Sequence, residues 1–404
     1  MNISFENTQI AFEYKTDKEL KKARFLFASM TIGWLVKIGT RITPWIIKSG
    51  LPLKGLIRKT IFAQFVGGET LKETSKVAAK LSRFNVQVIL DYGVEGKEGE
   101  QNFENAANGF IEVIEYAATQ PNIPFISIKL TGFARFELLE KLDATSNYSD
   151  TIQGITSTNE LSNDEKAEWQ RVLERLERIC EAADKNNIGV LIDAEESWIQ
   201  KPVDALTVRM MQKFNNKKAV VYNTIQLYRR KQLQFLKDNF EESKKSNYVP
   251  GFKLVRGAYM EKENKRAAAL NYPSPIQPGK EHTDAEYNAA LQFCIENLND
   301  LYIIVASHNE MSNLYAVELL EKLQIPTNHP GIHFSQLYGM SDNITFNLAK
   351  AGCAVSKYLP FGPIKDVIPY LMRRAQENSS VSGQTGRELA LIKSEIKRRA
   401  FENK

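Results

Sequence analysis

Eight short apolar segments rich in β-branched residues recur along this chain, and most of them are separated by stretches with helical periodicity. Such an alternation, repeated eight times, is typical of a (β/α)8 barrel rather than of an open sheet. We therefore predict an α/β fold, a distorted TIM-type barrel. The predicted strands are Val86–Tyr92, Phe125–Leu130, Gly189–Ala194, Ala219–Leu227, Phe252–Val255, Tyr302–Ala306, Gly331–Gln336 and Ala354–Pro360.

The spacing of these strands divides the chain of 404 residues into an N-terminal helical segment, residues 1–80, and a catalytic barrel, residues 81–404. Helices are expected at Glu165–Lys185, Pro202–Phe214 and Asp284–Asn299, and Ser162 with Glu165 forms a capping box for the first. Two polar inserts, Asp143–Asn163 and Glu261–His282, are predicted to be loops at the rim of the barrel.

Charge is concentrated near the N-terminus. The range 20–68 holds nine Lys or Arg and no Asp or Glu, within a chain whose net charge is +5. A basic segment with interspersed aromatic residues suits an anionic membrane surface, and it equally suits helices that pack on the barrel with their lysines in water. Its longest uncharged run, 12 residues at Phe25–Val36, is too short to span a bilayer.

Cysteine and histidine usage excludes several classes of site. The three cysteines are far apart, which fits a reducing compartment and argues against disulfides, and no zinc spacing occurs among the four histidines. No phosphate-binding GxxxxGK[ST] loop, GxGxxG fingerprint or nucleophile beside a base is present. We expect no metal and no nucleic-acid partner.

Polar residues stand at nearly every predicted strand end, which is where barrels of this class carry their chemistry. Any one of them is compatible with a capping or snorkelling role, but together they predict a site for anions and a polar heterocycle, served by a cofactor. They are Asp91, Lys129, Asp193, Glu195, Glu196, Gln226, Lys253, Arg256, His308, Asn309, Gln336 and Tyr358.

The segment Tyr358–Asn378 reads as a strand, a turn and then a helix. At helical spacing one side of the helix carries Tyr370, Arg373, Arg374 and Glu377. The two guanidiniums can therefore face one planar anion, and Glu377 can fix the orientation of the Arg373 guanidinium. A solvated, charged helix end is the plainer interpretation. The position of this helix, last in the barrel order, favours function.

At this point the residues resemble proline dehydrogenase, a flavin enzyme family. The resemblance runs in family order over about residues 86–378, and KLVRGAY and YLMRRAQEN together are specific. The matching segments are Ile128–Leu130, Asp193–Glu196, Lys253–Tyr259, Ser307–Asn309, Gln336–Met340 and Tyr358–Asn378.

The resemblance implies oxidation of L-proline to Δ1-pyrroline-5-carboxylate by hydride transfer from the ring to FAD, with Asp193 and Lys253 as catalytic positions. The substrate carboxylate would lie between Lys129, Arg373 and Arg374, with Asp193 and Glu377 as compensating charges. The ring of the substrate proline would pack against Tyr358, Tyr370 and Leu337. The bulk of Tyr358 should disfavour a substrate with a 4-hydroxyl group on that ring. The helix carrying the two arginines would then lie over the barrel mouth, since a helix beside the barrel could not reach the substrate.

The resemblance also implies the FAD site and the partners. Lys253 would stabilise the reduced flavin, and Arg256 and His308 suit the pyrophosphate and adenosine end. We expect electrons to pass to a membrane quinone, which favours contact of residues 20–68 with the cytoplasmic face of a membrane, and a separate pyrroline-5-carboxylate dehydrogenase downstream. The implied cofactor positions are Ala194, Gln226, Lys253, Arg256, Gly257, Ala258, Ser307 and His308.

Three alternatives stay open. The first is a hydroxyproline dehydrogenase on the same scaffold. The second is a Schiff-base aldolase that uses Lys129 at a strand end. The third is a basic membrane scaffold without activity, which the polar strand ends disfavour.

Overall fold

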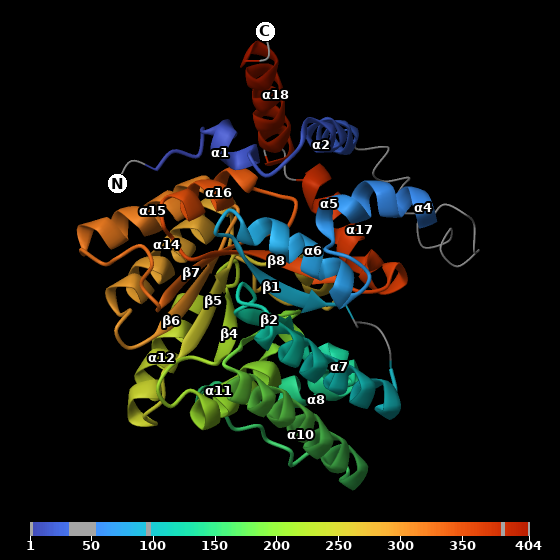
Figure 1. The fold of residues 1–404 in the computed structure, drawn as a ribbon. Helices are drawn as coiled ribbons and strands as arrows, with labels where there is room; N and C mark the ends of the chain where they lie inside the picture. The colour runs from blue at the N-terminus through green and yellow to red at the C-terminus, as the bar shows by residue number, and fades with distance from the viewer. Residues whose placement is uncertain (1–2, 32–53, 94–97, 381–383, 403–404) are drawn as a thin grey trace. The chain divides into compact units, whose positions relative to one another are not determined.

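The computed structural model describes residues 3–31, 54–93, 98–380 and 384–402, and it confirms the barrel. Its parallel strands close in sequence order, from β1 to β8 (Figure 1). The strands are β1 Gln87–Tyr92, β2 Phe125–Ile128, β3 Gly189–Ile192, β4 Val221–Gln226, β5 Gly251–Val255, β6 Tyr302–Ala306, β7 Ile332–Leu337 and β8 Val355–Phe361.

Continuous burial explains why the strands read as apolar runs rather than as alternating patterns. Every residue of β3, β4 and β8 is buried, because helices cover the outside and side chains fill the inside of such a barrel. Neighbouring strands run parallel, with Gln87 opposite Ser356 and Asn223 opposite Phe252. All eight predicted strands overlap the observed ones.

The chain forms two compact units, one comprising residues 1–94 with 335–404 and the other residues 95–334. The predicted division between residues 80 and 81 falls near the end of helix α6, Leu71–Ser82. As a domain boundary it stays a prediction.

The first unit contains the N-terminal helices, and its core joins them to the last two helices of the chain. Phe12, Phe27 and Phe65 are buried here with Leu371 and Ile392. The predicted helical character of the N-terminal segment holds for its described residues, while residues 32–53 lie outside them. The helices are α1 Thr8–Phe12, α2 Asp17–Met30, α4 Lys54–Ile57, the π-helix η1 Arg58–Phe62, α5 Ala63–Phe65, α6, α16 Asp342–Lys350, α17 Ile364–Ser380 and α18 Gln384–Glu402.

A helix after the arginine pair was not predicted. The pair lies on α17, as expected, but α17 is followed by α18, which lies beside α1 and α2 (Figure 1). Arg399 of α18 donates hydrogen bonds to the carbonyls of Phe12 and Lys15, which fixes α18 to the N-terminal segment. The arginine-bearing helix is therefore not the last helix, and its placement over the barrel mouth stays a prediction.

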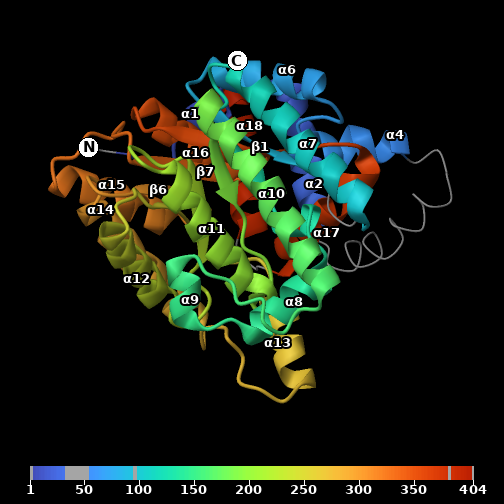
Figure 2. The same cartoon turned by 90° about the horizontal axis from the view of Figure 1, so that it is seen from below.

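The second unit carries the helices that surround β2 to β6. Helix α10 begins at the predicted capping box of Ser162 and Glu165, and ends at Asn187 in the left-handed region. Each predicted insert contains a helix, α9 in the first and α13 in the second (Figure 2), so the prediction of loops was wrong there. The elements are α7 Glu100–Ala118, η2 Leu130–Gly132, α8 Phe136–Thr145, α9 Tyr148–Gln153, α10 Asn163–Asn186, η3 Ser197–Ile199, α11 Gln200–Phe214, α12 Gln232–Lys245, α13 Met260–Ala269, α14 Lys280–Glu296 and α15 Glu310–Lys322.

Candidate active site

A buried ion pair joins the ends of two strands in the second unit. Asp193 directly follows β3, and its Oδ1 lies 2.5 Å from Nζ of Lys253 on β5. The two side chains are only 12% and 7% exposed, so the attraction between their charges acts in a low-dielectric setting. Both residues were predicted as catalytic positions, but their pairing was not. Asp193 was expected to compensate the substrate-binding cations.

The loop after β3 is held by its buried glutamates. The hydroxyl of Thr131 donates to both carboxylate oxygens of Glu195, at 2.8 and 2.9 Å. The ammonium of Lys262 lies 2.6 Å from Glu196 Oε1. Glu196 is thus buried with a charge partner and Glu195 with a hydrogen-bond donor, and both side chains tie the loop that carries Asp193 to neighbouring elements.

Sequence reasoning missed a buried amide network behind that loop. The side chain of Gln200 accepts from the Glu195 N–H at 3.1 Å and donates to Asp204 at 2.9 Å. Asn223 of β4 donates to the same Asp204 oxygen at 3.1 Å. Burial raises the pKa of Asp204 to about 6, while the hydrogen bonds from Gln200 and Asn223 oppose that shift. No local pattern in the sequence distinguishes these residues from ordinary helix and strand polar groups.

The same network sets the orientation of Gln226, a predicted cofactor residue at the end of β4. Its Nε2 donates to the Glu195 carbonyl at 2.9 Å, and its Oε1 accepts from Arg229 at 3.4 Å. The amide is 2% exposed. Gln226 is therefore presented at the strand end in a defined orientation.

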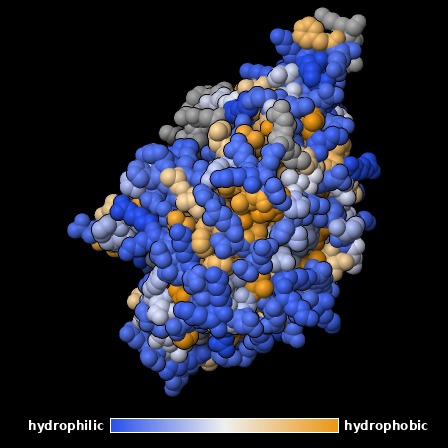
Figure 3. Space-filling view, turned by 90° about the vertical axis from the view of Figure 1, so that its left-hand side faces the viewer, coloured by the Kyte–Doolittle hydropathy of each residue, from blue (hydrophilic) through white to orange (hydrophobic). Residues whose placement is uncertain are grey.

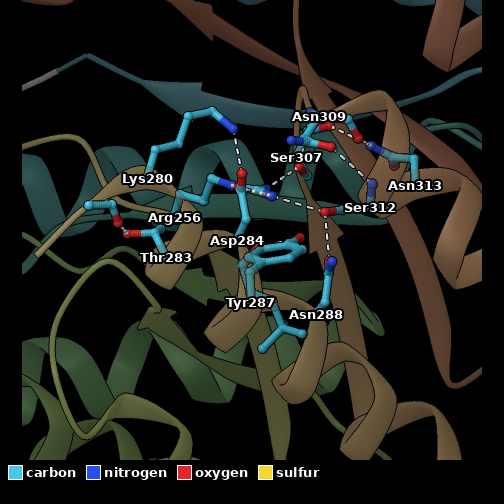
Figure 4. A network of polar contacts seen from close by, with 12 residues as sticks. Arg256, Lys280, Thr283, Asp284, Tyr287, Asn288, Ser307, Asn309, Ser312 and Asn313 are labelled. Carbon is cyan, nitrogen blue, oxygen red and sulfur yellow. Dashed lines mark hydrogen bonds and ion pairs between the residues drawn. The ribbon is translucent and has the colours of Figure 1, made fainter. Parts of the chain in front are cut away.

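The ends of β5 and β6 carry the remaining predicted cofactor positions. Arg256 Nη1 donates to Ser307 Oγ at 2.8 Å, which joins the two strand ends (Figure 4). Gly257 and Ala258 are exposed, and His308 is half-buried. Gly257 has φ +139°, and a Cβ there would lie 2.3 Å from the Tyr228 ring. Only glycine fits this close approach.

These groups fit a flavin dinucleotide in their donor set. A guanidinium suits a pyrophosphate, and an ammonium, an amide and a hydroxyl suit the polar edge of an isoalloxazine. They stand on the consecutive strands β4, β5 and β6 or directly after them. Within the part of the chain that the structure describes, no three His, Cys, Asp or Glu side chains gather as a metal site.

The predicted substrate residues fall in both units. Lys129 follows β2 in the second unit, while Leu337, Tyr358 and the α17 residues belong to the first. Tyr358 is 7% exposed on β8 and Leu337 is half-buried at the end of β7. A carboxylate anchor shared between Lys129 and the arginines therefore stays a prediction.

The helical spacing predicted for the arginine pair is present. Tyr370 and Arg374 are 9% and 8% exposed, and Arg374 Cζ lies 5.3 Å from the centroid of the Tyr370 ring. Arg373 is half-buried. The side chain of Glu377 lies outside the described residues, so its predicted support of Arg373 is untested. Burial of Arg374 argues against a fully solvated helix end.

The proline dehydrogenase family model matches residues 74–387. Proline dehydrogenase 1, mitochondrial, of Dictyostelium discoideum is 34% identical over 381 residues, which cover 87% of this chain and 67% of that protein. Hydroxyproline dehydrogenase of Xenopus laevis is 30% identical over 96% of this chain and 89% of its own length.

Among solved structures, proline utilization A from Bdellovibrio bacteriovorus, inactivated by N-propargylglycine, is similar in fold. Its TM-score is 0.69 at 21% identity, over 92% of this chain. This chain spans 38% of the length of that one. The fold, the match to the family model and the curated relatives agree with the resemblance predicted from the sequence, and the chain belongs to the proline dehydrogenase family of oxidoreductases.

Proposed function

We propose that the protein oxidises L-proline to Δ1-pyrroline-5-carboxylate with FAD as cofactor, as a first step of proline breakdown toward glutamate. The observation that carries this proposal is the set of polar groups at the ends of β3 to β6, centred on the Asp193–Lys253 pair. FAD, when bound, supplies the hydride acceptor. The chain's own residues bind both partners, orient the ring and exclude water.

Lys253 acts as the fixed cation on the flavin side of the site. A positive charge near the flavin N5 edge stabilises electron density that arrives there. The 2.5 Å contact with Asp193 fixes the position and direction of the buried Lys253 ammonium. Ala194, Gln226, Arg256, Gly257, Ala258, Ser307 and His308 form the rest of the proposed cofactor site.

Lys129, Arg373 and Arg374 bind the carboxylate of the substrate, and Tyr358, Tyr370 and Leu337 pack against its ring. Glu377 compensates the excess positive charge. A carboxylate held by charge-assisted hydrogen bonds fixes the ring for transfer of hydride from C5, because small displacements from that geometry slow the reaction strongly.

A second candidate is a hydroxyproline dehydrogenase, favoured by the relative of that name. Tyr358 on the predicted ring wall argues against a 4-hydroxyl group. Steady-state kinetics with L-proline and trans-4-hydroxyproline decide between them: a higher kcat/KM for hydroxyproline overturns our choice. A Schiff-base aldolase predicts trapping of substrate on Lys129 by borohydride.

We also propose that the electrons pass to a membrane quinone and that a separate pyrroline-5-carboxylate dehydrogenase consumes the product. The N-terminal segment 20–68 would then contact the cytoplasmic face of the membrane. Lys21, Lys22 and Phe25 are exposed on α2, with Phe25 at 74%. None of the described helices is long and apolar enough to cross a bilayer. The face of the molecule in Figure 3 shows hydrophobic patches among hydrophilic residues. Loss of liposome binding after Lys21→Glu with Lys22→Glu supports this contact, and unchanged binding refutes it.

The central test is an absorbance spectrum of the purified protein before and after addition of L-proline. A yellow protein whose flavin band bleaches supports the proposal. A colourless protein that cannot take up FAD overturns it. Arg373→Met and Arg374→Met should each raise KM for proline by about tenfold or more through loss of a charge-assisted hydrogen bond, and unchanged kinetics in both remove the anchor.

A further inference from the structure

Arg256, at the end of β5, is held by a carboxylate that lies outside the segments resembling the family. Oδ1 of Asp284, on α14, lies 2.8 Å from Nε of Arg256 and 2.7 Å from its Nη2 (Figure 4). The opposite edge of the guanidinium donates to Ser307 Oγ at 2.8 Å. The plane of the guanidinium is thus fixed from two sides.

Stacking on an aromatic ring restricts the Arg256 guanidinium further. The Arg256 Cζ lies 4.4 Å from the centroid of the Tyr287 ring, and this ring is completely buried. The hydroxyl of Tyr287 donates to the carbonyl of Leu254 at 3.3 Å, which attaches α14 to β5. Nη2 also donates to Ser312 Oγ at 2.9 Å. A stacked, multiply bonded guanidinium has little rotational freedom left.

Asp284 serves a second cation as well. Its other carboxylate oxygen contacts the ammonium of Lys280, one helical turn earlier on α14. Burial alone would raise the pKa of Asp284, but the hydrogen bonds from Lys280 and Arg256 hold it below its ordinary value. Lys280 is 75% exposed, so its contribution is screened by solvent, whereas the Arg256 side chain is only 23% exposed.

These contacts use most of the five N–H donors of Arg256. A guanidinium committed in this way offers a ligand its charge and its remaining Nη1 donor in one fixed direction. It does not offer a free bidentate fork. Its effect on a bound phosphate therefore depends on the groups that fix it, and among them only Asp284 neutralises its charge.

We infer that Asp284 is a positioning residue for the dinucleotide cofactor: it holds Arg256 in the orientation that receives the pyrophosphate. This inference rests on the proposed function. Two effects of removing Asp284 oppose each other. Loss of a negative charge favours a bound anion, while loss of the anchor frees Arg256 and weakens binding. Positioning requires the second effect to dominate, so that removal of an acidic residue makes an anionic cofactor leave faster.

The test measures the release of FAD from the holoenzyme after dilution, by the rise in flavin fluorescence. Asp284→Ala is expected to speed release about tenfold, the change expected when one charge-assisted contact is lost. Asp284→Asn should speed it less, because an amide oxygen still accepts from Nε. Asp284→Glu should restore part of the loss. Lys280→Gln is the matched control on the same helix, and release should change less than about twofold.

A double-mutant cycle separates positioning from a general loss of structure. If Asp284 acts through Arg256, then Arg256→Ala with Asp284→Ala releases FAD no faster than Arg256→Ala alone. Additive effects, or release from Asp284→Ala and Asp284→Asn at or below the wild-type rate, overturn the inference. If Asp284→Ala does not fold, Asp284→Asn and Asp284→Glu still decide. A wild-type protein that holds no flavin refutes the proposed function itself, so the two failures are distinct.

Discussion

Glu388 of α18 offers a quantitative test of the packing in the first unit, because burial disfavours the ionised form of its carboxyl group. It is 4% exposed, and it accepts a hydrogen bond from the Ser341 N–H. Burial, reinforced by the nearby Asp342 carboxylate, raises its pKa from 4.5 to about 7, although Lys357 and Lys15 oppose that shift. The folded protein therefore retains a proton on Glu388 at pH values where the unfolded chain has lost it.

The difference in proton binding gives the sign and the size of the contribution of Glu388 to the free energy of unfolding. Between pH 4.5 and about 7 the folded state binds more protons than the unfolded state, so the contribution of Glu388 to stability falls as pH rises through that window. At 1.36 kcal/mol for each pKa unit, the ionised side chain costs the folded state at most about 3 kcal/mol above pH 7. Glu388→Gln keeps an acceptor for Ser341 and cannot ionise, so it should remove that loss.

The assay is urea unfolding of wild type and Glu388→Gln, followed by circular dichroism at several pH values from 5 to 8. We expect similar free energies of unfolding near pH 5, and a variant that becomes more stable than wild type by up to about 3 kcal/mol at pH 8. The difference between the free energies of unfolding of the two proteins at each pH cancels the titration of all other groups. Glu115→Gln, on the exposed side of α7, is the control and should show no such trend. A difference that is constant with pH, or that shrinks as pH rises, would refute the reasoning.

Three further changes test the described packing, each by urea unfolding at pH 7. Replacing the fully buried Lys357 by Met removes the 2.9 Å ion pair to Asp342, and it should lower the free energy of unfolding by about 3 kcal/mol because a buried carboxylate loses a cation; an unchanged or higher stability contradicts the pairing. Gln200→Leu leaves a backbone N–H and a buried carboxylate short of a partner, so a loss of about 2 kcal/mol is expected, and a neutral result argues against the network behind β3. Gly257→Ala places a Cβ 2.3 Å from the Tyr228 ring at φ +139° and should lower stability by more than about 1 kcal/mol; wild-type stability would show that the close approach is not required.

Much of the fold could be predicted because its signals are local. A buried strand is recognisable as a short apolar run, and the start of α10 is recognisable from Ser162 and Glu165, three residues apart. Helix α9 was missed because the insert around it is rich in Ser and Thr, and α13 because the insert that contains it continues into three prolines, so each short helix was taken together with its loop-like surroundings. Helix α18 was missed for a different reason, since it packs against the distant α1 and α2, which no local pattern indicates.

The sequence by itself determined the barrel order, the strand ends that carry polar groups and the family. These follow from period, spacing and short matching segments, none of which requires knowledge of distant partners. Only the tertiary structure decided that Asp193 pairs with Lys253 across 60 residues, that Gln200 supports the loop after β3, and that Asp284 fixes Arg256. Closure of the barrel brings the ends of neighbouring strands together, and the partner of a buried charge depends on register and helix packing that no local pattern encodes.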